Sequence, residues 1–326
     1  MKVFITGSTG FVGKPLSLKL ADQGHEVTAL YRPKSNSKTP THPNISYAEG
    51  NILDQDSLRQ GINGCDTVLH VAAYARMYEK EPGIFTKVNV EGTRNVCEAA
   101  VAERINTIVF VSTAGVMPPS ENGELVSERE HDGELPSAYE KSKLVAEKVV
   151  LEYEKKGIKV VIVNPSRIYG PGPLIESNSV TRLFKMYDEG KWRFIPGDGK
   201  SIGNYVYVDD VVDGIIAAAK DGRSGERYIL SGSNINYLQL FELLQQCTGR
   251  RHKLYKIPVP VLMTFAYLQI AYAKFTKNDP KIVPAFVKKL NKNWALSSGK
   301  AQEHFGYSYT SIEEGMKRTL NWLDGQ

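Results

Sequence analysis

The sequence predicts an α/β protein built on a doubly wound parallel sheet, followed by a smaller, mostly helical C-terminal domain. Over the first two thirds of the 326 residues, short β-branched runs alternate with longer segments that contain helical patterns, as parallel crossovers require. The first run leads directly into a glycine-rich turn. After Pro165 the pattern changes, and loops rich in glycine and proline begin.

The expected strands of the sheet are five short apolar runs, at residues 3–5, 27–30, 67–71, 107–111 and 159–163. They are rich in β-branched residues, which strands prefer, and most of their residues are apolar, as in strands buried on both faces. Helical patterns that start near Gly, Pro, Ser or Asp cover residues 11–22, 86–103, 137–156 and 210–220. This alternation predicts the doubly wound arrangement.

Two breaks interrupt the chain after the last of these five strands. Residues 170–173 and 196–199 predict loops, whereas strand and helix patterns return between Tyr205 and Leu230. A helix at 238–248 and three further helical stretches follow. We therefore expect one domain formed by residues 1–164 and 205–232, and a discontinuous substrate domain formed by residues 165–204 and 233–326.

The most apolar window lies between Lys256 and Lys274. It is interrupted by prolines and is shorter than the roughly 20 residues that cross a bilayer, so we expect no membrane span and predict a buried helix there. The second domain also holds aromatic residues that either line an apolar pocket or form plain core: Trp192, Phe194, Phe265, Tyr267 and Tyr272.

Composition narrows the possible function classes. The chain is 41% hydrophobic and 24% charged, which is typical of globular proteins, and its net charge of +5 is scattered, so a nucleic-acid partner is not indicated. Cys65, Cys97 and Cys247 lack CxxC spacing, which indicates neither disulfides nor a metal site. No secretory signal is recognisable at the start. We therefore expect a cytoplasmic protein.

The strongest motif is the turn after the first strand, which consists of Thr6, Gly7, Ser8, Thr9, Gly10, Phe11, Val12 and Gly13. Its glycines let the backbone turn tightly and approach a pyrophosphate, whose charge is met by N–H groups of the helix N-terminus. The spacing is GxxGxxG rather than the usual GxGxxG. Glycines that merely permit a tight turn are the alternative, but the strand before and the helix after favour a dinucleotide site.

The end of the second strand favours NADP (NADPH) over NAD. A carboxylate there would bind the free 2′-hydroxyl of NAD, yet no acidic residue occurs from 27 through 48. Arg32, together with Lys34 or Lys38, is suited to charge-assisted hydrogen bonds with a 2′-phosphate. A solvated basic loop is the alternative reading.

A phenol and an ammonium group stand four residues apart at Tyr139 and Lys143, so both project from one face of a helix. Spacing alone is weak evidence, because Tyr187 and Lys191 form a second such pair. The first pair follows a strand at whose carboxyl end a substrate would lie. Nearby positive charge would lower the pKa of the phenol and suit it to proton transfer, and Ser112 or Thr113 would hydrogen-bond the reacting oxygen.

Seven motifs occur in order: TGSTGFVG (6–13), HVAA (70–73), VNVEGT (88–93), STAGV (112–116), Tyr139-xxx-Lys143, NPSRIYGPG (164–172) and YVYVDD (205–210). As a set they resemble the extended short-chain dehydrogenase/reductases of the NAD(P)-dependent epimerase/dehydratase superfamily. Within it, the resemblance is to the branch of dihydroflavonol reductases and 3β-hydroxysteroid dehydrogenases. It runs through essentially the whole chain.

The resemblance implies a Rossmann domain that carries NAD(P), with Tyr139 as the general acid/base. Lys143 would hold the nicotinamide ribose and tune the phenol, and Thr113, or in second place Ser112, would orient the carbonyl. Asn89 matches the asparagine of a proton relay near the lysine. Further cofactor contacts are implied for Asn51, which stands where an aspartate often meets the adenine, and for Ile52, Val71, Ala72, Ala73 and Pro165.

Two other features have plainer interpretations. Asp209 and Asp210 stand at a strand-to-helix junction, where acidic residues cap helices, so a structural role is expected rather than a metal site. His70 ends an apolar strand without a second ligand spaced to help it, which favours packing.

The family resemblance leaves three functions open. An NADPH-dependent reductase of an aldehyde or ketone is favoured, because sugar-nucleotide epimerases commonly carry an arginine where this chain has Gly203, although Arg182 or Arg193 could substitute. The alternatives are an NAD(P)-dependent nucleotide-sugar epimerase or dehydratase, and a non-catalytic NADP-binding sensor or scaffold. Family members often pair through helices that correspond here to 86–103 and 137–156, so a homodimer and a monomer both remain open.

Overall fold

The computed structural model describes residues 1–33, 39–121, 123–128, 135–276 and 278–326. Its centre is a seven-stranded sheet in the order β10-β6-β5-β4-β1-β2-β3, with all neighbouring strands parallel. The strands are β1 (Lys2–Thr6), β2 (Glu26–Tyr31), β3 (Ile45–Glu49), β4 (Thr67–His70), β5 (Thr107–Val111), β6 (Lys159–Pro165) and β10 (Arg227–Leu230). This order confirms the predicted doubly wound α/β fold.

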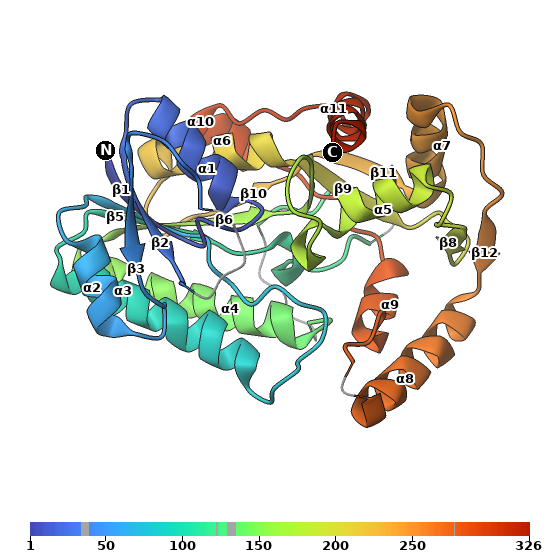
Figure 1. Cartoon of the computed structure of the whole chain (residues 1–326), viewed down its shortest axis with the longest axis horizontal. Helices are drawn as coiled ribbons and strands as arrows, with labels where there is room; N and C mark the ends of the chain where they lie inside the picture. Colours follow the sequence, from blue (N-terminus) through green and yellow to red (C-terminus); the bar gives the residue numbers. More distant parts are fainter. Residues whose placement is uncertain (34–38, 122, 129–134, 277) are drawn as a thin grey trace.

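Helices cover both faces of the sheet (Figure 1). One face carries α1 (Gly13–Asp22), α6 (Val208–Asp221) and α10 (Gly299–Phe305), and the other carries α2 (Gln55–Ile62), α3 (Gly92–Ala102) and α4 (Ala138–Leu151). Alternate residues of β5 enter separate cores: Val109 and Val111 pack with α1 and α6, whereas Ile108 and Phe110 pack with α2, α3 and α4. Burial on both faces explains why the strands read as continuous apolar runs.

Two elements of this region were absent from the sequence prediction. Strand β3 lies at the edge of the sheet, and three of its five residues are exposed, so it lacks a continuous apolar run. Helix α2 is short and mostly polar, although Asp54 caps it by accepting N–H bonds from Asp56 and Ser57. Neither segment therefore has the apolar pattern by which the other strands and helices were predicted.

Two expected helices have internal changes of geometry. The one predicted at 86–103 begins with a π-helical turn, Thr86–Glu91, and continues as α3. The one predicted at 137–156 contains α4 and then a 3₁₀ turn, Glu154–Lys156. Because π-helical turns occur frequently at functional sites, the position of Asn89 in the first of these is notable.

A further core is formed by later segments of the chain. Strands β7 (Arg167–Tyr169), β9 (Ile202–Tyr207) and β11 (Ser233–Asn236) make a three-stranded sheet, and β8 (Phe194–Pro196) pairs with β12 (Tyr255–Ile257). Helices α5 (Ser179–Asp188), α7 (Tyr237–Thr248) and α11 (Ile312–Asp324) pack together around Phe184, Leu240 and Met316.

These segments fall within the range predicted for the substrate domain, except that β9 crosses its predicted boundary at residue 205. Helix α10 falls in the same predicted range but packs on α6 and β10 instead. The domain boundaries as a whole stay a prediction.

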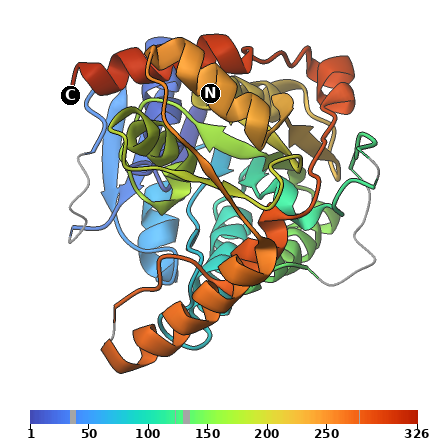
Figure 2. The ribbon, with the colours of Figure 1, turned by 90° about the vertical axis from the view of Figure 1, so that its right-hand side faces the viewer.

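Helices α8 (Val259–Thr276) and α9 (Pro284–Leu290) pack against each other, and α8 projects beyond the rest of the molecule (Figures 1 and 2). The predicted buried helix in the apolar window is wrong, because only Ala266 and Ala273 of α8 are buried. The aromatic residues considered for a pocket or core are partly buried at Trp192 and exposed at Phe194, Phe265, Tyr267 and Tyr272. Among the described helices, none combines the length and the apolar character needed to cross a membrane.

Candidate active site

The glycine turn between β1 and α1 packs directly against the segment that follows β4. Gly7 has φ +74°, and a Cβ added there would lie 2.8 Å from the backbone N of Ala72. A Cβ on Gly13 would lie 2.1 Å from the carbonyl oxygen of Gly7. Neither position accepts a side chain, and the turn ends at the N-terminus of α1, where backbone N–H groups lack helical partners.

Strand β1 lies where the order of the sheet reverses, because the chain runs from β1 to β2 and β3 on one side and then to β4 on the other. Ligands of such sheets bind in the crevice outside the carboxyl ends of the strands at this point. Thr6 joins the two sides, since its Oγ1 accepts the Ala72 N–H at 3.1 Å. Val71, Ala72 and Ala73 therefore lie beside the glycine turn.

The side chains of the turn face different surroundings. Phe11 and Val12 are buried in the core under α1, so only their backbone is available to a ligand. Gly10 donates its N–H to the Gly7 carbonyl at 2.9 Å, and Thr9 is partly buried. Ser8 donates to the carbonyl of Leu30 at 2.8 Å, which links the turn to the end of β2.

The residues predicted to contact the adenosine half of the cofactor follow β2 and β3 in the sequence. Arg32 is exposed directly after β2, whereas Lys34 and Lys38 lie outside the described residues. After β3, the Asn51 side-chain oxygen already accepts the N–H of Leu53 at 3.1 Å, and the buried Ile52 side chain packs on α3. These positions share the carboxyl edge with the glycine turn.

His70 is held inside the sheet by two hydroxyl groups. Its Nδ1 lies 2.7 Å from Thr6 Oγ1, and its Nε2 lies 3.0 Å from Thr93 Oγ1. Burial, with the charge of Lys143 adding to it, lowers the pKa of His70 to about 3, so the ring is neutral. The packing role expected for it agrees with these contacts.

Tyr139 and Lys143 lie one turn apart near the start of α4. Ser137 caps the helix by accepting the Tyr139 N–H at 3.2 Å. Lys143 is 1% exposed, and its Nζ donates to the Val111 carbonyl at the end of β5 at 2.8 Å. The same ammonium lies 3.9 Å from the ring centroid of Phe110.

The charges around this pair differ from the sequence expectation. Burial lowers the pKa of Lys143 to about 7, and the Glu147 carboxylate acts in the opposite direction. Burial raises the pKa of Tyr139 above the ordinary phenol value, and the neighbouring Glu140 carboxylate raises it further. In the protein without cofactor, burial and the Glu140 carboxylate thus raise the pKa of Tyr139, and Lys143 donates to a backbone carbonyl. The lowering expected from Lys143 together with an oxidised nicotinamide stays a prediction for the complex.

Asn89 is connected to the first turn of α4. Its Oδ1 accepts the Tyr74 N–H at 2.7 Å, and its Nδ2 donates to Ser142 Oγ at 2.9 Å. Ser142 in turn donates to the carbonyl oxygen of Tyr139 at 2.7 Å. The π-helical turn thus fixes Tyr139 through its backbone, by way of Ser142, which the sequence analysis did not single out.

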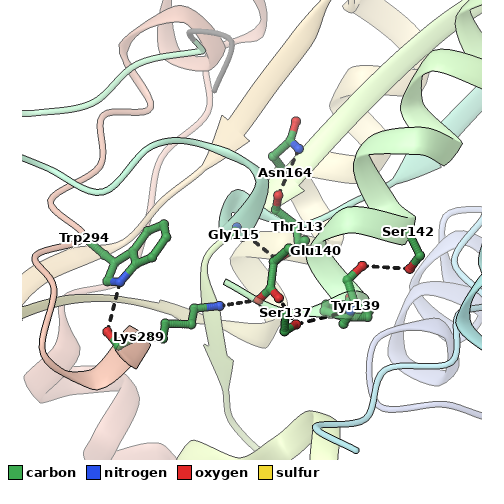
Figure 3. Close-up of polar contacts among 9 residues, drawn as sticks. All are labelled: Thr113, Gly115, Ser137, Tyr139, Glu140, Ser142, Asn164, Lys289 and Trp294. Carbon is green, nitrogen blue, oxygen red and sulfur yellow. Dashed lines mark hydrogen bonds and ion pairs between the residues drawn. The ribbon is translucent and has the colours of Figure 1, made fainter. Parts of the chain in front are cut away.

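Hydroxyl groups gather at the carboxyl ends of β5 and β6. Thr113 Oγ1 accepts the Gly115 N–H at 3.1 Å, and the Thr113 carbonyl accepts from Asn164 Nδ2 at 3.1 Å (Figure 3). Ser112 directly follows β5, and Ser166 directly follows Pro165, the last residue of β6. Both have buried hydroxyls that make no hydrogen bond within the described part of the chain. Buried hydroxyls without partners are uncommon, so they point to a ligand on this edge.

An ion pair next to the phenol was missed by the sequence analysis. Glu140 is 4% exposed, and its Oε1 lies 2.7 Å from Nζ of Lys289 on α9 (Figure 3). Burial acts to raise the pKa of Glu140, but the charge and hydrogen bond of Lys289, with a hydrogen bond from Ser137, hold it below its ordinary value. A Cβ on Gly115 would lie 2.9 Å from Glu140 Cγ, so the glycine admits this pair.

Arg167 was also missed. Its Nη1 donates to the hydroxyls of Tyr205 at 3.3 Å and Tyr237 at 3.2 Å. A Cβ on Gly203 would lie 2.6 Å from the same nitrogen. The guanidinium of Arg167 therefore lies beside Gly203, the position at which sugar-nucleotide epimerases commonly carry an arginine. The only sequence signal for Arg167 was its place in the motif NPSRIYGPG.

Asp209 and Asp210 stand in the first turn of α6. The Asp210 carboxylate accepts bonds from the N–H and the hydroxyl of Thr310, both at 2.8 Å. This ties the C-terminal segment to α6 and agrees with the structural role expected. Within the described ranges, no group of three or more His, Cys, Asp or Glu side chains is placed to hold a metal ion.

The edge as a whole fits a nicotinamide dinucleotide. The glycine turn after β1 has no side chains at Gly7, Gly10 and Gly13. The hydroxyls of Ser112 and Ser166 have no hydrogen-bond partner among the described residues, and Lys143 reaches the end of β5, which β4 separates from β1. The donor set is rich in backbone N–H and hydroxyl groups, as such cofactors require.

Comparisons with known proteins agree with this geometry. A model of the NAD dependent epimerase/dehydratase family matches residues 3–231. The chain is 27% identical to a 2-alkyl-3-oxoalkanoate reductase of Shewanella oneidensis, over 97% of this chain and 84% of the relative. It is 26% identical to a decarboxylating sterol-4-alpha-carboxylate 3-dehydrogenase of Saccharomyces cerevisiae, over 99% and 97%. The solved UDP-glucose 4-epimerase of Thermotoga maritima superposes with a TM-score of 0.81 at 25% identity, over 100% and 99%.

Proposed function

This chain belongs to the NAD-dependent epimerase/dehydratase family and is an NAD(P)-dependent enzyme of the extended short-chain dehydrogenase/reductase type, and from that premise we propose that it reduces an aldehyde or ketone with NADPH. The observation that carries the proposal is the convergence on one sheet edge. The glycine turn follows β1, and the Ser112 hydroxyl follows β5. Lys143, one helical turn from Tyr139, donates to the Val111 carbonyl at the end of β5.

Tyr139 has the environment of a proton donor. Its pKa is raised by burial and by Glu140, so the phenol stays protonated at neutral pH. The bound cofactor would supply the hydride. As negative charge develops on the carbonyl oxygen, that oxygen becomes a stronger base than a phenolate, and Tyr139 can transfer its proton to it. The raised pKa therefore suits the direction of reduction.

The strand-end hydroxyls would hold the reacting oxygen. Ser112 has a buried hydroxyl without a partner in the described structure. Thr113 already accepts the Gly115 N–H, which leaves the proton of its hydroxyl to donate. Lys143, whose ammonium is buried at the end of β5, would hold a ribose hydroxyl of the cofactor and add positive charge near the phenol. Asn89 and Ser142 would keep α4 in place.

Arg167 favours a carbonyl compound over a nucleotide sugar. Position 203 is a glycine, and the guanidinium of Arg167 lies beside it and donates to two tyrosine hydroxyls, so no arginine at 203 grips a diphosphate in this chain. The names of the relatives in Shewanella and Saccharomyces, which refer to a keto acid and to a sterol, support a bulky apolar carbonyl substrate. Exposed Arg32 supports NADP over NAD.

A nucleotide-sugar epimerase or dehydratase is the second candidate, because the fold superposes on the UDP-glucose 4-epimerase over the whole chain. One experiment separates the two. The purified protein is incubated with NADPH and a panel of aromatic aldehydes, cyclic ketones, 2-alkyl-3-oxoalkanoates and UDP- or dTDP-sugars, and NADPH absorbance and sugar isomers are followed separately. We expect NADPH loss in step with alcohol formation. Sugar isomerisation without net NADPH loss would contradict the reductase.

A non-catalytic NADP sensor is the remaining alternative. It predicts cofactor binding without turnover of any compound in the panel, and equal behaviour of the wild type and Tyr139→Phe. The intact Tyr139 and Lys143 pair argues against it.

A further inference from the structure

Bulky apolar side chains form a continuous stripe along the outer side of α8. The stripe consists of Val261, Phe265, Leu268, Tyr272 and Phe275, which are 57%, 48%, 62%, 57% and 88% exposed. Their spacing of four, three, four and three residues places all five on one face of the helix. We refer to these five residues as the α8 stripe.

The opposite side of α8 is apolar as well, because Leu262, Met263 and Ile270 lie there and are partly buried. The two buried positions, Ala266 and Ala273, also lie away from the stripe, and α8 packs against α9. A surface helix normally turns its apolar residues to the core and its polar residues outward, whereas α8 carries bulky apolar residues on its exposed side too. Contiguous exposed apolar surface of this kind marks an interaction site.

The sequence around α8 is strongly basic. From Leu243 through Gln302 the chain holds eleven lysines and arginines and a single acidic residue, Asp279, whereas the whole chain has a net charge of only +5. Asp279 is itself approached by Arg76 at 3.5 Å and by Lys80 at 3.9 Å. Exposed cations occur in α8 and on either side of it in the sequence, at Lys256, Lys274, Lys281, Lys288 and Lys292. The chain around the stripe therefore carries positive charge that Asp279 does not balance.

We propose that α8 docks this protein on the surface of an anionic phospholipid bilayer. Lying flat, a helix of 18 residues extends about 27 Å, with its apolar face at the boundary between headgroups and acyl chains. The lysines on either side meet lipid phosphates. Tyr272 is suited to this boundary, because its ring is apolar and its hydroxyl is polar.

A second copy of this chain fits the stripe less well than a bilayer. A two-fold dimer through α8 would bring the same basic surface of both copies together, and the lysines would repel each other. The helix also projects from the body as an isolated ridge, with α9 on one side (Figure 2). A ridge of this shape enters a fluid surface without needing a complementary groove.

The docked helix lies next to the candidate active site. Helix α9, on which α8 packs, carries Lys289, and Lys289 binds Glu140 beside Tyr139. A bilayer at α8 would thus deliver an apolar carbonyl compound close to the site. This last step rests on the proposed function, whereas the docking itself does not.

Vesicle flotation tests the docking. The wild type is mixed with vesicles of phosphatidylcholine alone or with about one third phosphatidylglycerol. We expect it to float with the anionic vesicles, and to be released by high salt to the level seen with phosphatidylcholine. The triple variant Phe265→Gln/Leu268→Gln/Phe275→Gln should lose about tenfold or more of this binding, since three apolar side chains no longer enter the lipid.

The control replaces exposed apolar residues elsewhere: Leu125→Gln/Ile175→Gln/Tyr309→Gln, which are 62%, 47% and 43% exposed. Both triple variants should keep the circular dichroism and melting temperature of the wild type, and the control should keep vesicle binding. The proposal is overturned if the wild type stays with the unbound fraction, or if the α8 variant floats as well as the control. A wild-type dimer that the α8 variant converts to a monomer in light scattering would instead assign the stripe to a second copy.

Reductase activity gives an independent readout. With a water-soluble aldehyde the α8 variant should match the wild type, and with an apolar ketone carried in anionic vesicles it should be slower. Loss of flotation without loss of soluble-substrate turnover separates failure of docking from failure of the proposed function.

Discussion

Helices α4 and α8 are built in opposite ways. Helix α4 buries Glu140, Lys143 and Glu147, which are at most 4% exposed, whereas α8 exposes large aromatic and aliphatic side chains such as Phe275 at 88%. In α4 every buried charge has a partner inside the chain, and these partners come from distant segments. In α8 only Ala266 and Ala273 are buried, although the helix packs on α9, and the five side chains of the α8 stripe stay exposed.

The difference indicates that the side chains of α4 are stabilised by contacts within the chain, and those of α8 by contacts outside it. A buried charge is tolerated only when it is paired and hydrogen-bonded, and Glu147 has both Arg227 and Asn164 within 2.7 Å. An exposed apolar stripe of this size is stabilised only by something outside the chain. Folding of the chain therefore provides partners for the buried charges of α4, whereas it leaves the apolar stripe of α8 exposed.

The largest expected effect is the loss of turnover in Tyr139→Phe. Removing the phenolic hydroxyl takes away the proposed proton donor, and we expect kcat for the true substrate to fall by about 10²- to 10⁴-fold. NADPH binding, measured by fluorescence, should be unchanged because the glycine turn is untouched. Both measurements together show whether the buried face of α4 serves chemistry or packing.

Tyr187→Phe is the matched control for that variant. Tyr187 stands four residues before Lys191, as Tyr139 does before Lys143, but its hydroxyl donates to the Arg250 carbonyl in the further core. Its loss should leave kcat within about twofold of the wild type. Full activity in Tyr139→Phe would show that the proposed donor is wrong.

The next largest effect concerns the stability of α4. Arg227→Met leaves the fully buried Glu147 without its cation, and we expect the free energy of unfolding to fall by about 3–5 kcal/mol in urea titrations. Arg318→Met removes the partner of Glu314 in a pair whose two side chains are 55% and 51% exposed, and should change stability by at most about 0.5 kcal/mol. Equal effects of the two substitutions would mean that burial is not what makes the α4 pairs matter.

A smaller, pH-dependent effect is expected at the contact between α4 and α9. Lys289→Met removes the cation that lowers the pKa of Glu140, and should cost about 2 kcal/mol of unfolding free energy at neutral pH. Because the folded-state pKa of Glu140 lies below the unfolded one, the stability from this pair is present above the ordinary carboxyl pKa. It is lost as the pH falls through the folded-state value.

Urea titrations at neutral pH and near about pH 3 check this sign, since the difference between wild type and variant should shrink in acid. Lys288→Met is the control, because it changes an exposed neighbour on the same helix that lies outside the pair. A difference that grows in acid would show that Glu140 is not the group responsible.

The parts of the fold that sequence could predict are those whose signals are local. The glycine turn, its strand and its helix are contiguous, and Tyr139 and Lys143 share a helix face by spacing alone. Pairs such as Glu140 with Lys289, and Arg167 with Tyr237, join segments 149 and 70 residues apart, so no local pattern indicates them. The same holds for the direction of the Lys143 side chain, which is decided by the carbonyl of Val111.

Helix α8 was misjudged for a different reason. Its hydropathy indicated burial, but mean hydropathy does not tell on which side of a helix the large residues lie. The side of α8 away from the stripe also holds apolar residues, namely Leu262, Met263 and Ile270, so the sequence pattern alone does not indicate which side packs on α9. The edge strand β3 was missed because exposure leaves it polar.

The smallest effect concerns Arg32, which resembles the α8 stripe in being exposed toward a partner outside the chain. Arg32→Ala removes a charge-assisted bond to the 2′-phosphate, and should weaken NADPH binding by about five- to tenfold while NADH binding stays the same. Arg59→Ala is the control, because that exposed arginine pairs with Glu103 instead. Titrations of cofactor fluorescence measure both dissociation constants. If Arg32→Ala weakens NADPH and NADH equally, the residue acts through general attraction of an anion, and the preference for NADP must be sought in other contacts of the same edge.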